Sequence, residues 1–272
     1  SEDAEVDALR DSQAIWGELG WMPIEPLEIN AGVRLENHSD YDFPVTGSLS
    51  AKWMYSELFA LHGRLTNGFS PPTGNDLYFP GSGNLNLNPE SARNLEAGIS
   101  LGNLASRYYG KVTFFKSEID DLIEFGMPNR NLGSVEISGM ELSFSVNITS
   151  SLRGFLGLTL LDPKNVRTGE KFLDRRPKNS GSFRIEWYGD DTIVGFDSSI
   201  RRKMMERDFS AWPASWIESD NYLVSRIFAS KFIGREWRLF GKIENLFDES
   251  YDEVHGYPAL GRNFNIGLRY FF

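Results

Sequence analysis

Side chains that could perform acid–base, nucleophilic or metal chemistry are few in this sequence. The three histidines, His38, His62 and His255, are far apart. The absence of cysteine excludes a disulfide scaffold, a thiolate zinc site and a cysteine nucleophile. Asp120 and Asp121 are adjacent, so on a strand their carboxylates would point to opposite faces and could not work as an acid–base pair. We therefore expect no catalytic residue, no metal site, no cofactor and no enzyme activity.

Aromatic side chains on loop-like segments are better candidates, and they indicate binding. Segment 76–83 carries Tyr78 and Phe79 among turn-forming residues, which suits a large flat ligand. Trp212, Trp216 and Tyr257 lie on similar segments and are candidates for the same reason. A plain long loop explains segment 76–83 at least as well.

The net charge of the chain limits the classes of partner that it could bind. Lys+Arg 28 against Asp+Glu 38 gives a net charge of −10, the wrong sign for a nucleic-acid binder. The acidic run 248–253 could offer oxygen ligands to a divalent cation. It lacks a glycine-punctuated loop of recognised spacing, so a solvated acidic surface is the favoured interpretation.

The elements that must position these residues alternate apolar and polar side chains with a period of two, as strands do. The clearest examples are segments 27–36, 94–101, 140–148, 237–244 and 262–272. The whole chain predicts roughly 13 antiparallel strands, repeating about every 20 residues. Aromatic content of 14% with a mean hydropathy of −0.35 is typical of a transmembrane β-barrel.

Connection lengths predict a direction across the membrane. Short connections near residues 23–26, 55–57, 102–105, 149–151, 189–191 and 234–236 alternate with long ones, and short turns face the periplasm in outer-membrane barrels. This places Phe272 at the periplasmic end and residues 1–12 in a loop outside the cell. Because the strand number is odd and the first strand runs inward, the sequence predicts a barrel that needs further strands to close.

Several short motifs occur in order along the chain. They are NLNPE at 86–90, RNLE at 93–96, DLIE at 121–124, SGME at 138–141, RRP at 175–177, GKIENLFDESY at 241–251, GYP at 256–258, GR at 261–262 and YFF at 270–272. These motifs resemble those of the TonB-dependent outer-membrane receptors, in particular the vitamin B12 (cobalamin) receptor branch. The resemblance implies a 22-stranded barrel filled by an N-terminal plug. Residues 13–272 would then be the C-terminal part of that barrel, with about nine strands and the plug outside the sequence.

The resemblance also implies a function and its partners. Surface loops would capture a scarce ligand, and TonB with ExbB and ExbD would use proton-motive force to displace the plug in the outer membrane of a Gram-negative bacterium. Lipopolysaccharide and outer-membrane lipid would surround the barrel, and a surface lipoprotein could cap it. Three alternatives stay open: a cobalamin transporter, a siderophore receptor, and a plugless piece serving as a structural scaffold.

Individual residues acquire expected roles from this arrangement. The lumen would be lined by residues such as Arg34, Arg64, Glu96, Glu141, Arg184 and Lys242. Candidates for contacts with lipopolysaccharide phosphates, weighed against ordinary solvated loop charge, are Arg175, Arg176, Arg201, Arg202 and Lys203. Tyr270 and Phe272 resemble a barrel-insertion signal, and an aromatic belt at the membrane interface accounts for them equally. The Asn245–Asp248 segment is expected to be structural.

Overall fold

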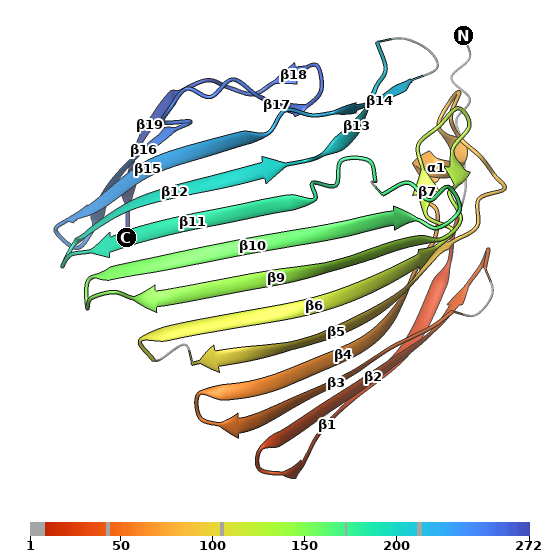
Figure 1. The fold of residues 1–272 in the computed structure, drawn as a ribbon, viewed down its shortest axis with the longest axis horizontal. Helices are drawn as coiled ribbons and strands as arrows, with labels where there is room; N and C mark the ends of the chain where they lie inside the picture. Colours follow the sequence, from red (N-terminus) through yellow and green to blue (C-terminus); the bar gives the residue numbers. More distant parts are fainter. Residues whose placement is uncertain (1–8, 42–43, 104–105, 172, 211–213) are drawn as a thin grey trace.

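The computed structural model describes residues 9–41, 44–103, 106–171, 173–210 and 214–272. Its main feature is one curved antiparallel sheet of 13 strands in the order β1-β2-β3-β4-β5-β6-β9-β10-β11-β12-β15-β16-β19 (Figure 1). The predicted all-β fold with roughly 13 strands is confirmed. The sheet strands are β1 Ser12–Ile24, β2 Leu27–His38, β3 Val45–Ser56, β4 Phe59–Ser70, β5 Glu90–Gly102, β6 Tyr108–Asp120, β9 Val135–Asn147, β10 Leu152–Asn165, β11 Asn179–Tyr188, β12 Thr192–Arg202, β15 Tyr222–Ile233, β16 Trp237–Glu244 and β19 Asn263–Tyr270.

Each strand presents two chemically different faces. Along β5, residues on the face of Leu95 are exposed, whereas those on the face of Glu96 are half-buried. We call the face of Glu96 the inner face and the face of Leu95 the outer face. Apolar side chains such as Leu95 (51% exposed) and Ile99 (38%) recur on the outer face at two-residue intervals. This pattern suits a wall with a nonpolar medium outside and polar surroundings inside.

The short and long connections lie at opposite ends of the sheet, as predicted. At the short-turn end, Gly102 and Gly234 have positive φ values of 78° and 68°, which glycine adopts without steric cost. The long connections contain ordered pieces that the sequence pattern did not predict, all at the same end (Figure 1). These pieces are α1 Gly74–Tyr78, β7 Ile123–Glu124, β8 Arg130–Asn131, β13 Met205–Asp208, β14 Ser215–Glu218, β17 Asp252–Val254 and β18 Tyr257–Pro258.

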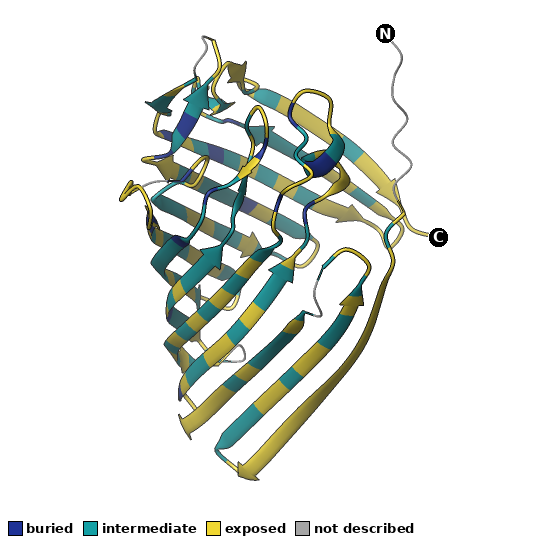
Figure 2. Ribbon diagram, turned by 90° about the vertical axis from the view of Figure 1, so that its right-hand side faces the viewer, coloured by how far each residue is buried: buried dark blue, intermediate teal, exposed yellow. Residues whose placement is uncertain are grey.

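The buried core lies mostly among these loops rather than on the sheet (Figure 2). Leu132, Val135 and Leu173 form the apolar cluster. Asn129 ties the loop before it to segment 71–89, because its Nδ2 donates to the carbonyl oxygen of Asp76 (3.1 Å) and its backbone N–H donates to that of Ser82 (2.7 Å). The described parts of the long connections lie at one end of the sheet, and these bonds join two of them (Figure 1). We call these connections together the loop layer.

The inner face is crowded where rings lie over glycines on neighbouring strands. A Cβ atom added at Gly195 would lie 2.2 Å from the Phe228 ring, and one at Gly267 would lie 2.4 Å from the Phe240 ring. Glycine is needed at both positions because the ring occupies the place of a side chain.

Both edges of the sheet are open in the described chain. β1 pairs only with β2, and β19 pairs only with β16. Every residue of β1 is exposed, in contrast to the central strands. Each edge therefore offers a row of backbone donors and acceptors to a further strand. No helix within the described residues is long and apolar enough to span a membrane.

Candidate functional site

The strand register gathers the predicted lumen-lining residues on the inner face. Arg64 on β4 lies opposite Glu96 on β5. Arg34 pairs with Glu36, two residues along β2, at 2.8 Å. His62 shares the same face, and its Nε2 lies 3.1 Å from Thr113 Oγ1. Among the described residues, the Thr113 hydroxyl is the hydrogen-bond partner of the His62 ring, and we interpret His62 as a wall residue.

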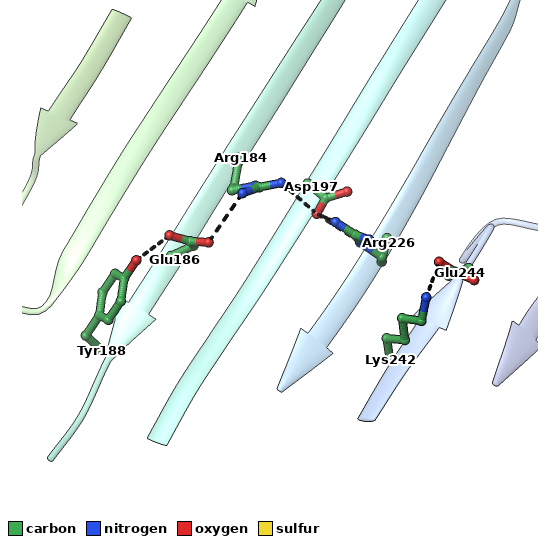
Figure 3. Close-up of polar contacts among 7 residues, drawn as sticks. All are labelled: Arg184, Glu186, Tyr188, Asp197, Arg226, Lys242 and Glu244. Atoms are coloured by element: carbon green, nitrogen blue, oxygen red, sulfur yellow. Dashed lines mark hydrogen bonds and ion pairs between the residues drawn. The ribbon is translucent and has the colours of Figure 1, made fainter. Parts of the chain in front are cut away.

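A run of charged side chains crosses β11, β12 and β15 on this face (Figure 3). Arg184 contacts Glu186 (Nη1–Oε1 3.7 Å) and Asp197 (Nη2–Oδ2 3.8 Å). Arg226 donates to the same Oδ2 atom of Asp197 from Nε (3.0 Å) and Nη2 (2.6 Å). Arg184, Asp197 and Arg226 are direct cross-strand partners, so their opposite charges stabilise the sheet.

The run continues to either side. On β16, Lys242 Nζ contacts Glu244 Oε1 at 2.6 Å. At the other end, the Tyr188 hydroxyl donates to Glu186. These charged side chains neutralise one another within the wall. We call the set Arg184, Glu186, Tyr188, Asp197, Arg226, Lys242 and Glu244 the charged ladder.

A second candidate is a cavity of about 460 Å³ in the loop layer, which we call the loop cavity. It is lined by residues of β7, β8, β13 and β14 and by described residues between Asn165 and Arg176. Its central carboxylate, Glu124, accepts hydrogen bonds from Arg130 Nε (3.2 Å) and Nη2 (2.9 Å) and pairs with Arg207. Arg207 also donates to the Phe125 carbonyl oxygen at 3.2 Å and lies over the Trp216 ring.

Further ionisable groups line the loop cavity. Burial raises the pKa of the Asp174 carboxyl, against the opposing charges of Arg175 and Arg207. Arg167 and Arg176 also line the cavity, and neither has a side-chain hydrogen bond or ion pair among the described residues. Unpaired guanidinium groups beside aromatic rings can bind a polar ligand with an anionic group.

The most deeply buried carboxylate holds two loops together. Glu206 on β13 is 1% exposed. Its Oε1 accepts a hydrogen bond from the Ser219 hydroxyl, and its Oε2 accepts one from the backbone N–H of His255 at 3.0 Å. Glu206 thereby joins the β13–β14 hairpin to the loop that carries β17 and β18.

The predicted aromatic ligand contacts are dispersed. Trp216 lines the loop cavity. Phe79 follows α1 and is 55% exposed, Tyr78 ends α1, and Tyr257 on β18 is 74% exposed. None of these three lines the loop cavity. Trp212 lies outside the described residues.

The acidic run 248–253 closes turns. Asp248 Oδ1 accepts from the backbone N–H of Arg262 (2.7 Å), and Asp252 Oδ2 accepts from that of Gly256 (2.9 Å). Asn245 is buried, and its Nδ2 donates to the carbonyl oxygens of Glu249 (2.8 Å) and Leu260 (3.2 Å). Within the described ranges, no cluster of three or more histidine, aspartate or glutamate residues could hold a metal ion.

The basic residues proposed for lipopolysaccharide are divided between surfaces. Arg202 lies opposite Asn179 on the outer face, whereas Arg201 lies opposite Ser180 and Tyr222 on the inner face. The others belong to the loop layer: Arg176 lines the loop cavity, and Arg175 and Lys203 occupy turns with positive φ. At the opposite end, Tyr270 packs on Trp237 (centroids 4.7 Å apart) and on Phe272 (5.1 Å).

Sequence reasoning missed Glu124, Glu206 and Arg207 as organisers of the loops. Glu124 lay within the DLIE motif, which suggested a family but no role. Glu206 and Arg207 stand in a segment without periodicity. Their hydrogen bonds and ion pairs with residues on other segments identify them.

Comparison with known proteins gives the family. Residues 4–246 match the family described as TonB dependent receptor-like, beta-barrel. The chain is 28% identical over 259 residues to the vitamin B12 transporter BtuB of Photobacterium profundum, covering 92% of this chain and 41% of that protein. The chain therefore spans about two fifths of the length of this relative.

Solved structures share the fold at low sequence identity. The ferric-catecholate import receptor Fiu of E. coli K12 matches with a TM-score of 0.77 at 20% identity, over 96% of this chain and 45% of the receptor. The copper transporter OprC matches with a TM-score of 0.81 at 16% identity, over 96% of this chain and 48% of OprC. The family consists of transporters and receptors that work with TonB, not of enzymes. The chain belongs to the TonB-dependent receptor β-barrel family.

Proposed function

We propose that residues 13–272 form the C-terminal barrel wall of an outer-membrane transporter that imports a scarce ligand such as cobalamin in a Gram-negative bacterium. The observation that carries the proposal is the alternation of the two faces of the sheet, clearest in β5, where Leu95 and Ile99 lie exposed on the outer face and Glu96 lies on the inner face, with the loop layer at one end of the sheet. Membrane lipid would cover the outer face, and the inner face would line the lumen.

The proposal includes an orientation and an energy source. The loop layer, with residues 1–12, faces the outside of the cell, and the short turns face the periplasm. The open edges at β1 and β19 pair with strands of an N-terminal, plug-bearing portion. TonB, ExbB and ExbD convey the proton-motive force that displaces the plug after the ligand has bound.

Ligand capture is assigned to the loop layer. The loop cavity offers Trp216, Arg167 and Arg176, while Tyr78, Phe79, Trp212 and Tyr257 belong to neighbouring loops. Cobalamin is favoured over a siderophore because the curated relative carries the name of a vitamin B12 transporter. Aromatic rings and guanidinium groups suit its large planar ring and its phosphate.

The surroundings of the barrel are part of the same proposal. Arg202, on the outer face, is the basic residue best placed for a lipopolysaccharide phosphate, and the further candidates are Arg175, Arg176, Arg201 and Lys203. Tyr270 and Phe272 serve as the signal for barrel insertion. A surface lipoprotein that caps the loop layer is a further partner.

The test begins with the intact outer-membrane complex, in which every polypeptide is identified by intact mass and peptide sequencing. A plug-bearing portion, on the same or a second chain, together with saturable cyanocobalamin binding that weakens in Trp216→Ala, is the expected result. Binding of a ferric siderophore instead of cyanocobalamin would overturn the ligand assignment. A complex without any plug would overturn transport and favour the scaffold.

A further inference from the structure

One of the hollows on the inner face lies near the short-turn end, apart from the loop layer. This cavity of about 460 Å³ spans β11, β12, β15, β16 and β19. Its charged lining comprises five cations, Arg184, Arg226, Arg238, Lys242 and Arg269, and one acid, Glu186. Tyr188, Phe228 and Phe240 supply ring surfaces between them. We call it the arginine pocket.

Three of these cations are neutralised by the wall itself. Arg184 and Arg226 share Asp197, and Lys242 is paired with Glu244, as part of the charged ladder (Figure 3). The cations of the charged ladder therefore need no external anion to balance their charge.

Arg238 and Arg269 lack such neutralisation. They are direct cross-strand partners on β16 and β19, so two like charges oppose each other on one face, an arrangement that destabilises a sheet. Arg238 Nη2 donates to Ser230 Oγ at 3.1 Å, while its buried Nε atom has no acceptor. No ion pair within the described residues includes either arginine.

We propose that the arginine pocket receives an acidic segment of the plug, whose carboxylate lies between Arg238 and Arg269. This inference rests on the proposed function, because it requires a plug-bearing portion in the lumen. A carboxylate would accept hydrogen bonds from the guanidinium groups of Arg238 and Arg269 and would relieve the repulsion between them. The ring surfaces favour a polypeptide segment, which brings aliphatic groups beside its charge, over a free inorganic anion.

The position of the pocket gives the contact a function. Its strands adjoin the open β19 edge, and Arg238 and Arg269 stand at the ends of β16 and β19 that lie opposite the loop layer. Figure 1 shows these strands at that edge of the sheet. A salt bridge there would hold the plug without contacting the captured ligand. Displacement of the plug would have to break it.

The decisive experiment uses the assembled receptor with Arg269→Lys, which keeps the positive charge and adds a reactive amine. The variant receptor is treated with a carbodiimide, which joins an amine to a carboxylate in contact with it without a spacer. Cross-linked peptides are then identified by mass spectrometry. We expect an amide between the introduced lysine and an aspartate or glutamate of the plug. Arg184→Lys is the matched control, and it should couple to Glu186 or Asp197 within the wall.

A second variant tests the consequence. Arg269→Glu should loosen the plug and raise outer-membrane passage of a large antibiotic at least tenfold, while Arg235→Glu, a reversal in the short turn beside β16, should leave it unchanged. Heat-modifiable migration on gels checks that both variants fold. If the lysine introduced at position 269 couples only to carboxylates within residues 12–272, to the cargo or to TonB, the inference about the plug is wrong, while the proposed transport function stands. Absence of a plug overturns both.

Discussion

Replacing the buried carboxylate of Glu206 should release one loop from another. In Glu206→Ala, the Ser219 hydroxyl and the His255 backbone N–H both lose their acceptor. A hydrogen bond to a charged group contributes about 1.5–3 kcal/mol, and an unsatisfied buried donor costs a similar amount. Because the two bonds are not independent, we expect a loss of about 3 kcal/mol in the free energy of loop opening, or roughly 100-fold more frequent opening.

Hydrogen–deuterium exchange measures this directly, because the His255 amide is itself one of the donors. In receptor reconstituted into lipid vesicles, peptides covering residues 250–258 should exchange roughly 100-fold faster in Glu206→Ala. Glu206→Gln keeps an acceptor oxygen and should show a smaller effect. Glu218→Gln removes an exposed carboxylate from β14 of the same hairpin and is the charge control. Equal exchange in Glu206→Ala and the unaltered protein would refute the reasoning.

Three further outcomes are expected. Gly195→Ala should lower thermal stability by about 1–3 kcal/mol in gel-shift melts because its methyl group would displace a ring, whereas Gly17→Ala, with no atom within 4 Å, should be neutral. The pKa of Asp174 is raised in the folded loops, so its protonated form stabilises them. This stabilisation is fully present below pH 3.8 and is lost as the pH rises through the folded pKa. Hydrogen–deuterium exchange of the loops, corrected for intrinsic rates, should show this pH dependence, and Asp174→Asn should abolish the dependence. Arg207→Ala, which leaves a buried carboxylate less compensated, should expose the β13–β14 hairpin to proteolysis more than Arg130→Ala does, and the reverse order would count against the buried pair.

The sheet was predictable because its signal is local. In β5, each residue between Glu90 and Gly102 shows the face it occupies through its own polarity, and a period of two needs no knowledge of distant residues. Short and long connections were equally visible. The number of strands and the direction of each therefore follow from the sequence.

The loop layer was not predictable in the same way. In the sequence, nothing distinguishes Glu206 from the other acidic residues. Its role depends on Ser219 and His255, which are 13 and 49 residues away. The opposition of Arg238 and Arg269 likewise depends on cross-strand register, which polarity restricts but does not set. Contacts between distant segments decide both features.

The central claim is that one face of this sheet meets lipid and the other lines the lumen. These 272 residues contain no cysteine, so a single cysteine can be placed in β5 at Leu95, Glu96, Ile99 and Ser100 in turn and compared with the unaltered receptor. In outer membranes, a water-soluble maleimide should label positions 96 and 100, and a lipid-dissolved quencher should reach fluorophores only at 95 and 99. Equal labelling and quenching at all four positions would contradict the account.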